Sequence, residues 1–91
     1  MKKAIITVVG KDSVGIIAGV CTFLAKNNIN ILDISQTIVN GYFNMMMVVD
    51  VSGIDDRFLE VSESLAKMGE ETLGVVAKIQ REEIFDKMHR I

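Results

Sequence analysis

The spacing of apolar residues changes along the chain, and each spacing predicts an element of secondary structure. Residues 4–9 form a continuous apolar run rich in β-branched side chains, which predicts a strand buried on at least one face. Residues 13–26 carry apolar side chains at intervals of three and four, the spacing of one helical face: Ile17, Val20, Cys21 and Leu24. We expect Asp12 or Ser13 to cap this helix and Asn27-Asn28 to supply the left-handed residue that ends it.

Two further runs, residues 29–39 and 42–51, flank the dipeptide Asn40-Gly41. Both of these residues tolerate the positive φ of a type I′ turn, so the pattern predicts a β-hairpin whose two-residue loop fixes the register. The expected pairs on the covered face are Ile38–Phe43, Gln36–Met45, Ile34–Met47 and Leu32–Val49. Gln36 is the one polar side chain among them, and we expect it to be buried with a defined hydrogen-bond partner.

The second half of the chain predicts another helix and strand. Asp55 and Asp56 precede a helix over residues 55–68 that ends at Gly69, and its apolar face is Phe58, Val61, Leu65 and Met68. Residues 73–80 alternate between apolar and other side chains, as expected for a strand. A short terminal helix follows Glu82 and Glu83, with Ile84, Phe85 and Met88 docked on the body of the domain.

The predicted order is strand, helix, strand, strand, helix, strand. This is the α+β, ferredoxin-like βαββαβ arrangement, in which two helices cover one face of a four-stranded antiparallel sheet and strands one and three are central. The other face has no cover within the chain, yet it is expected to carry apolar side chains: Ile31, Val39, Tyr42, Met46 and Val48. Such a patch usually meets another surface, so we expect a homodimer formed by sheet packing or by edge pairing.

Composition narrows the function further. The 91 residues fit a single domain over residues 1–91, and ten basic against twelve acidic residues argue against direct binding to nucleic acid. The longest uncharged apolar stretch, residues 13–25, is shorter than the ~20 residues of a membrane span. The single Cys and single His favour a reducing, cytoplasmic location without a metal site or other cofactor, and neither residue has an acid, base or nucleophile constellation around it. We therefore expect a protein that is not an enzyme.

The segment most informative about ligand binding is residues 10–15, at the first strand-to-helix junction. Unpaired backbone N–H groups at such a junction attract a carboxylate or a phosphate. Gly15 and Gly19 lie on one helical face and would allow a ligand or a second backbone to approach closely. A purely structural role for these glycines is equally open, because their spacing does not match the patterns of nucleotide sites.

Residues 8–18, followed by Asn-Asn-Ile-Asn-Ile at 27–31, resemble the ACT domain, a small-molecule-binding regulatory module with this topology. The resemblance covers nearly the whole chain and is closest to stand-alone, single-ACT proteins of bacteria and archaea, which are similar to the two-ACT glycine cleavage system transcriptional repressor. It extends to residues 30–37 and 43–45. The resemblance implies that an amino acid or similar metabolite binds between the first loop of one subunit and the second strand of its partner.

Carried over by position, the implied ligand contacts are Asp12, Gly15, Ile16, Asn30 and Ile31. Asp12 would accept a hydrogen bond from a ligand ammonium group, the amides of Gly15 and Ile16 would donate to its carboxylate, and Asn30 offers both a donor and an acceptor. The alternatives are that Asp12 only caps the helix and that Asn30 only begins a strand. Serine-binding members have histidine at position 10 and asparagine at position 12, so Gly10 and Asp12 argue against serine as the ligand.

Two other functions compete with this interpretation. One is a structural or protein-interaction dimer without a metabolite. The other is an acylphosphatase-like hydrolase, which would need an arginine beside the first loop, whereas no arginine precedes Arg57. Because the sequence offers no catalytic or DNA-binding output segment, a regulatory effect would pass through another protein.

Overall fold

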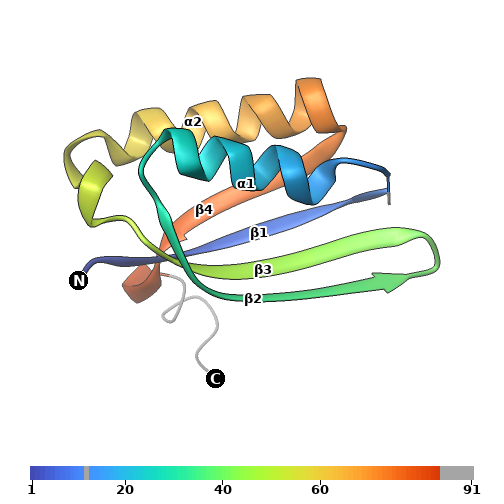
Figure 1. The fold of residues 1–91 in the computed structure, drawn as a ribbon, viewed down its shortest axis with the longest axis horizontal. Coiled ribbons are helices and arrows are strands. Elements are labelled where there is room, and N and C mark those ends of the chain that lie inside the picture. The colour runs from blue at the N-terminus through green and yellow to red at the C-terminus, as the bar shows by residue number, and fades with distance from the viewer. Residues whose placement is uncertain (12, 85–91) are drawn as a thin grey trace.

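The chain folds into four strands and two main helices, which follow one another in the predicted order (Figure 1). The computed structural model describes residues 1–11 and 13–84. Its elements are β1 (Lys3–Lys11), α1 (Ile16–Lys26), β2 (Asn30–Val39), β3 (Tyr42–Asp50), the 3-10 helix η1 (Ser52–Arg57), α2 (Phe58–Met68), the π-helical turn η2 (Gly69–Leu73) and β4 (Val75–Arg81). The sheet order β2-β3-β1-β4 with antiparallel pairing confirms the ferredoxin-like prediction.

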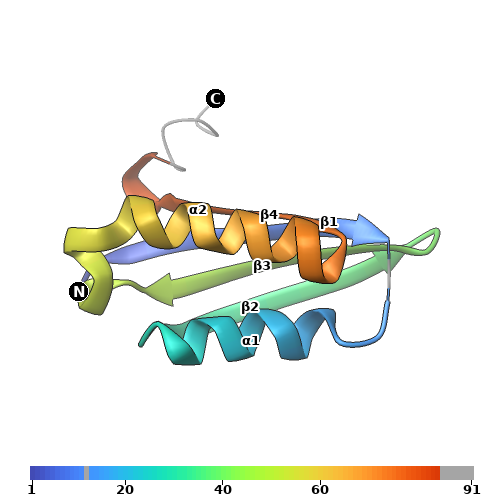
Figure 2. The same ribbon diagram turned by 90° about the horizontal axis from the view of Figure 1, so that it is seen from above.

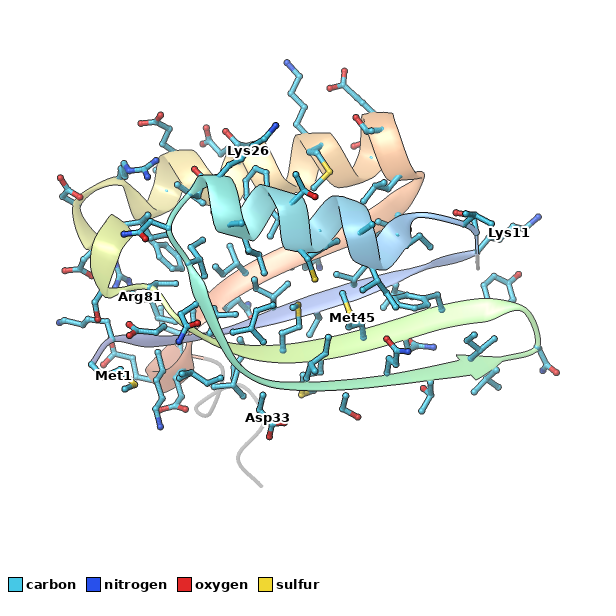
Figure 3. All side chains as sticks on the ribbon, in the orientation of Figure 1. Met1, Lys11, Lys26, Asp33, Met45 and Arg81 are labelled. Carbon is cyan, nitrogen blue, oxygen red and sulfur yellow. The ribbon has the colours of Figure 1, made fainter. Side chains whose placement is uncertain are left out.

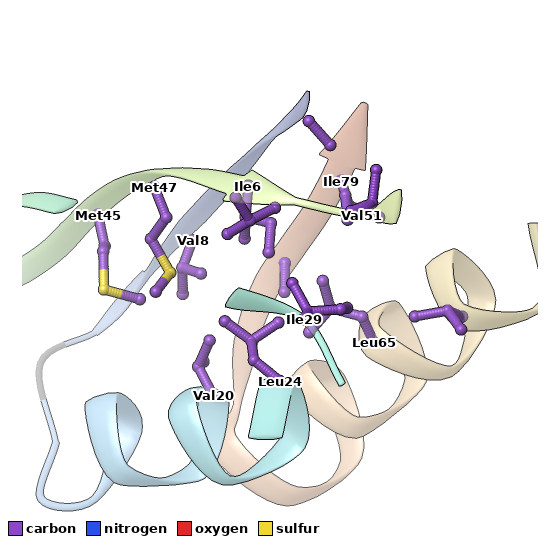
Figure 4. Packing of buried hydrophobic residues seen from close by; sticks show 14 of the residues in the cluster. Ile6, Val8, Val20, Leu24, Ile29, Met45, Met47, Val51, Leu65 and Ile79 are labelled. Atoms are coloured by element: carbon purple, nitrogen blue, oxygen red, sulfur yellow. The ribbon is translucent and has the colours of Figure 1, made fainter. Parts of the chain in front are cut away.

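Both helices lie on one face of the sheet, as Figures 1 and 2 show. Side chains that face the helices from β1, β3 and β4 form the core with the inner faces of α1 and α2, among them Ile6, Val8, Met47, Leu24 and Leu65 (Figure 4). Strand β2 contributes no residue to the fully buried set. It is therefore held mainly by its hairpin partner β3 and not by the core.

The hairpin confirms the predicted turn and most of the predicted register. Asn40 and Gly41 adopt φ values of 52° and 79°, as a type I′ turn requires. The predicted pairs hold from Val39–Tyr42 back to Asp33–Val48, but a bulge between Ile31 and Asp33 then shifts the register. Ile31 pairs with Val49 and packs against the core, so the predicted Leu32–Val49 pair and the placement of Ile31 on the open face are both wrong. An inserted bulge residue reverses the alternation, and apolar periodicity carries no signal for it.

Helix α1 begins later than the sequence predicts. Gly15, at φ 94°, occupies the N-cap position and no side chain caps the helix, so the predicted cap at Ser13 is wrong, while Asp12 lies outside the described residues. The buried face is Ile16, Val20 and Leu24, with Cys21 partly buried and Ile17 38% exposed. Asn28 ends this segment at φ 59°, which confirms the predicted left-handed residue.

Helix α2 has the predicted apolar face but different ends. Val61 and Leu65 are buried, and Phe58 and Met68 pack against the core. Neither Asp55 nor Asp56 caps the helix, which starts after Arg57 without a side-chain cap. Gly69 keeps a right-handed conformation at φ −60°, so the predicted helix end at Gly69 is wrong: the helical segment continues through η2 and ends at Gly74, where φ is 69°.

Beyond β4, residues 82–84 are helical, which agrees with the start of the predicted terminal helix. The rest of that prediction, including Phe85 and Met88, lies outside the described residues, as does His89. Within the part of the chain that the structure describes, no helix is long and apolar enough to cross a membrane.

Candidate functional site

A pocket of about 220 Å³ lies where the loop after β1, the start of α1 and the hairpin meet. The loop contributes Ser13 and Gly15, α1 contributes Ile16, Ile17 and Ala18, and the hairpin contributes Gln36, Ile38 and Phe43. Antiparallel pairing of β1 with β3 places Gly10 opposite Phe43 and so brings the loop to this end of the hairpin. Two of the residues implied by the resemblance, Gly15 and Ile16, thus line one pocket.

The local backbone leaves hydrogen-bond donors at this pocket. Gly15 adopts φ 94°, a conformation that favours glycine, and the Gly19 amide donates to the Gly15 carbonyl at 2.8 Å. The amides of Ile16, Ile17 and Ala18 precede that bond, so they belong to the group of N–H donors that a helix start leaves without partners inside the helix. Such amides and the helix dipole together favour an anionic group.

Gln36 is exposed, and the prediction that it is buried is wrong. Its register opposite Met45 places it on the helix side of the sheet, as predicted, but the core does not extend to β2. Its amide therefore lines the pocket together with the Ser13 hydroxyl, and these two side chains are the polar ones among the described lining residues. Ile17, Gln36, Ile38 and Phe43 line the pocket although no sequence motif marks them; the signal that points to them is the predicted register and strand order, which place the hairpin end beside the loop.

Asn30 and Ile31 lie away from this pocket. They begin β2 just after the C-terminal end of α1, whereas the pocket lies at the N-terminal end of the same helix. Eleven helical residues span about 16 Å, so one copy of the chain does not unite the two groups of implied ligand contacts. Ile31 is in addition partly buried against the core.

The pocket opens beside an apolar stripe at the edge of the sheet. We define the β2 stripe as Ile17 of α1 with Ile34 and Ile38 of β2, whose exposed fractions are 38%, 43% and 58%. Ile17 and Ile38 also line the pocket. Strand β2 is an edge strand, and one of its backbone donors, the Ile34 amide, is bound by the Asp33 carboxylate at 2.8 Å.

The two glycines of α1 have different roles. A Cβ at Gly19 would lie 2.8 Å from Leu73 Cδ2, so this glycine allows η2 to pack closely against α1. A Cβ at Gly15 would have no neighbour within 4 Å, and there it is the positive φ that favours glycine. Gly19 is therefore structural, and Gly15 sets the shape of the pocket loop.

The clearest charge interactions lie at the opposite end of the molecule. Arg81 pairs with Asp55 at 2.6 Å, and its guanidinium carbon lies 4.3 Å from the centre of the Phe58 ring. The hydrogen bond from Arg81 lowers the pKa of the Asp55 carboxyl, and the Ser52 hydroxyl and amide lower that of Asp50 in the same way. These are structural contacts that link η1 and α2 to the ends of β3 and β4.

Arg57 donates to the Asn27 side-chain oxygen at 3.3 Å, at the C-terminal end of α1. With Arg81 held by Asp55, neither arginine lies beside the loop where an acylphosphatase-like reaction would need one. Met45 and Met47 are buried in the core, while Met46 is exposed on the other face, as the alternation predicts. No group of three or more potential His, Cys, Asp or Glu metal ligands occurs among residues 1–11 and 13–84.

Comparison with known proteins agrees with this fold. A family model described as the ACT domain matches residues 2–80. A UPF0237 protein of Bifidobacterium longum is 59% identical over the full length of both chains. Among solved structures, an ACT domain protein from Streptococcus pneumoniae is 46% identical and covers 93% of this chain and 94% of its own, with a TM-score of 0.82.

A more distant structure shows the fold alone. A putative glycine cleavage system transcriptional repressor is 18% identical, with a TM-score of 0.70 over 88% of this chain and 45% of its own. The two more similar proteins above match this chain along almost the whole of their own length.

Proposed function

Because this chain belongs to the ACT domain family, we propose that it is a non-catalytic regulatory protein that binds an amino acid or a similar small metabolite between two copies of itself. The observation that carries the proposal is the position of the loop pocket. It opens beside an unpaired sheet edge, and two further implied contacts, Asn30 and Ile31, lie at the far end of that same edge. A second copy is the simplest way to complete the site.

Antiparallel pairing of two β2 edges brings the missing contacts to the pocket. When a twofold axis crosses the middle of β2, the start of one β2 lies beside the end of the other. The partner's Asn30 then approaches the pocket formed by Gly15, Ile16 and Ile38. The same pairing buries the β2 stripe and offers the Ile34 amide a carbonyl in place of the Asp33 carboxylate.

The pocket chemistry suits a small zwitterion. The amides at the start of α1 would receive the carboxylate, and the Ser13 hydroxyl and the Gln36 amide would hydrogen-bond polar atoms. Ile38 and Phe43 supply an apolar wall for a short side chain. The described lining residues carry no ionisable side chain, so the ammonium group would be met by Asp12 or by the partner's Asn30.

A ligand held by both copies favours the paired state and is bound more tightly by it, because linkage is reciprocal. This coupling turns the concentration of a metabolite into a change of assembly. The change would be passed to another protein that recognises the dimer.

The proposal is tested by a thermal-shift screen of the common amino acids, followed by calorimetry on those that stabilise the protein. A ligand at 100 times its dissociation constant is expected to add about 2.7 kcal/mol to the free energy of unfolding. Asn30→Ala is expected to remove this shift without unfolding the protein, since Asn30 is exposed. Asp12→Ala tests whether Asp12 also contacts the ligand: loss of the shift would show that it does, and a full shift would show that it does not.

Leu59→Ser is the matched control, because Leu59 is exposed on α2 and belongs neither to the pocket nor to the β2 stripe. It is expected to keep the full shift. A stable dimer that none of the ligands stabilises would instead support a structural or protein-interaction dimer.

A further inference from the structure

Gln36 carries the one side-chain amide among the described residues of the loop pocket, and its neighbours are apolar. Ile34 and Ile38 lie two residues before and after it on β2, so the three side chains share the helix side of that strand. Its neighbour across the hairpin is Met45, which points from β3 toward α1 (Figures 3 and 4). The surroundings of Gln36 thus offer apolar contact on three sides.

The amide of Gln36 is open to solvent in the single copy, because the side chain is exposed. Among residues 1–11 and 13–84, no other group forms a hydrogen bond with this amide. Its nitrogen is a donor and its oxygen is an acceptor, so both atoms need partners wherever solvent is removed. An amide that stays unpaired after desolvation weakens the association that buries it.

The proposed β2 dimer removes solvent from this amide. Ser35 lies at the middle of β2, and a twofold axis there places Gln36 opposite the partner's Ile34. The Ile34 amide then donates to the backbone carbonyl of the partner's Gln36. Side chains directly opposite each other in such a pair have Cβ atoms about 4.5–5.5 Å apart. The partner's Ile34 therefore packs beside Gln36, and a ligand in the pocket is left to satisfy the Gln36 amide.

We propose that Gln36 selects the ligand, an amino acid with a carboxamide side chain: asparagine or glutamine. This selection rests on the proposed function, because Gln36 acts on a ligand that is held between two copies. A carboxamide presents a donor and an acceptor side by side, so it can form two hydrogen bonds with the Gln36 amide. A hydroxyl group has one oxygen, which cannot meet both ends of that amide with straight hydrogen bonds. The methylene groups of the ligand then lie against Ile38 and Phe43.

The rest of the lining disfavours other side chains on the ligand. The described lining residues carry no ionisable group, so a carboxylate or ammonium group on the ligand side chain would be desolvated without a counter-charge. An aliphatic side chain would leave the Gln36 amide unpaired. A site that hydrogen-bonds its ligand discriminates strongly against an analogue without the polar group. The pocket volume of about 220 Å³ is below the ~300–1,000 Å³ of sites for drug-sized ligands, which suits a single amino acid.

Amino acids of similar shape test this selection on the full chain. Calorimetry compares asparagine with leucine and aspartate, and glutamine with methionine and glutamate. The wild type is expected to bind one of the two amides at least about tenfold more tightly than its apolar and its charged counterpart. Equal or tighter binding of a counterpart overturns the selection by Gln36 and leaves the proposed function standing. If no amino acid binds, both are overturned.

Gln36→Met keeps the length of the side chain and removes its polar end, so it is expected to bind the apolar counterpart more tightly than the amide. Gln36→Glu loses the donor and is expected to weaken binding of the amide without favouring the apolar counterpart. Gln80→Met is the matched control, because Gln80 lies on β4, the other edge strand, and outside the pocket. It is expected to keep the wild-type preference. Sedimentation velocity checks that each variant still forms the dimer, and a dimeric Gln36→Met with the wild-type preference overturns the proposal.

Discussion

Ile34→Glu places a charge in the middle of the edge strand that the proposed dimer pairs. Ile34 is 43% exposed in the single copy, and its neighbours on the β2 stripe are also half exposed. The substitution is therefore expected to change the stability of the single copy by less than about 1.5 kcal/mol, well below the cost of a substitution in the core.

The effect on the dimer is larger and can be worked from the exposed fraction. Full burial of an isoleucine side chain contributes about 1.5–3 kcal/mol, so burying the remaining 43% contributes roughly 0.6–1.3 kcal/mol per copy. Twofold symmetry doubles this contribution, and the glutamates add the cost of desolvating two like charges. The dimer dissociation constant is expected to rise at least about tenfold to hundredfold.

Sedimentation velocity measures the loss of the β2 dimer, and a thermal-shift assay with the identified amino acid measures the loss of binding. Leu59→Glu introduces the same charge at an exposed apolar position of α2 and is expected to change neither measurement. If Ile34→Glu pairs and binds its ligand as the wild type does, then the β2 edge is not where two copies meet.

Three other substitutions test the local arguments. Gly19→Val is expected to lower the free energy of unfolding by about 1–3 kcal/mol in urea titrations, because its side chain collides with Leu73; an unchanged midpoint would contradict the packing. Gly15→Ala is expected to cost about 1–2 kcal/mol from the positive φ alone and to weaken ligand binding, which calorimetry measures; full affinity would show that the loop conformation is irrelevant. Asp55→Asn removes a carboxyl whose pKa in the folded protein is lowered by Arg81. The wild type is therefore expected to be more stable than the variant above pH 3.8 and to lose that advantage as the pH falls below it. Urea midpoints that differ equally at all pH values would refute this.

The elements that the sequence predicts correctly are those with a local chemical cause. The Asn40-Gly41 turn needs two residues that tolerate positive φ, and this requirement fixes the hairpin register without any knowledge of the rest of the fold. The alternation of Met45, Met46 and Met47 likewise assigns each side chain to a face. Helix ends are harder to predict, because Ser13 and Asp55 are competent caps that the tertiary structure leaves unused.

The site is harder to predict than the fold, because its residues come together only through long-range geometry. Gly15 and Ile16 are marked by the loop sequence, but Gln36 and Phe43 reach the pocket through the pairing of β1 with β3. Gln36 also shows how an apolar pattern misleads. Its neighbours on the same face of β2 are apolar and predict burial, but Ile34 and Ile38 are themselves exposed because the core does not reach this edge.

Strand β2 therefore explains why a small chain of this fold would place its ligand site at an interface. Strand β2 supplies none of the fully buried side chains of the core, and Ile31 at its start packs against the core only in part. An apolar edge that the core does not need is free to be buried by another molecule, and the unpaired strand favours a partner that presents a matching edge. The pocket lies at one end of this edge and opens onto it, so a ligand there and a partner on the edge contact the same residues, Ile17 and Ile38. In the proposed dimer, binding and assembly would share one contact surface, and a small change of ligand concentration would alter the population of the dimer without any rearrangement of the core.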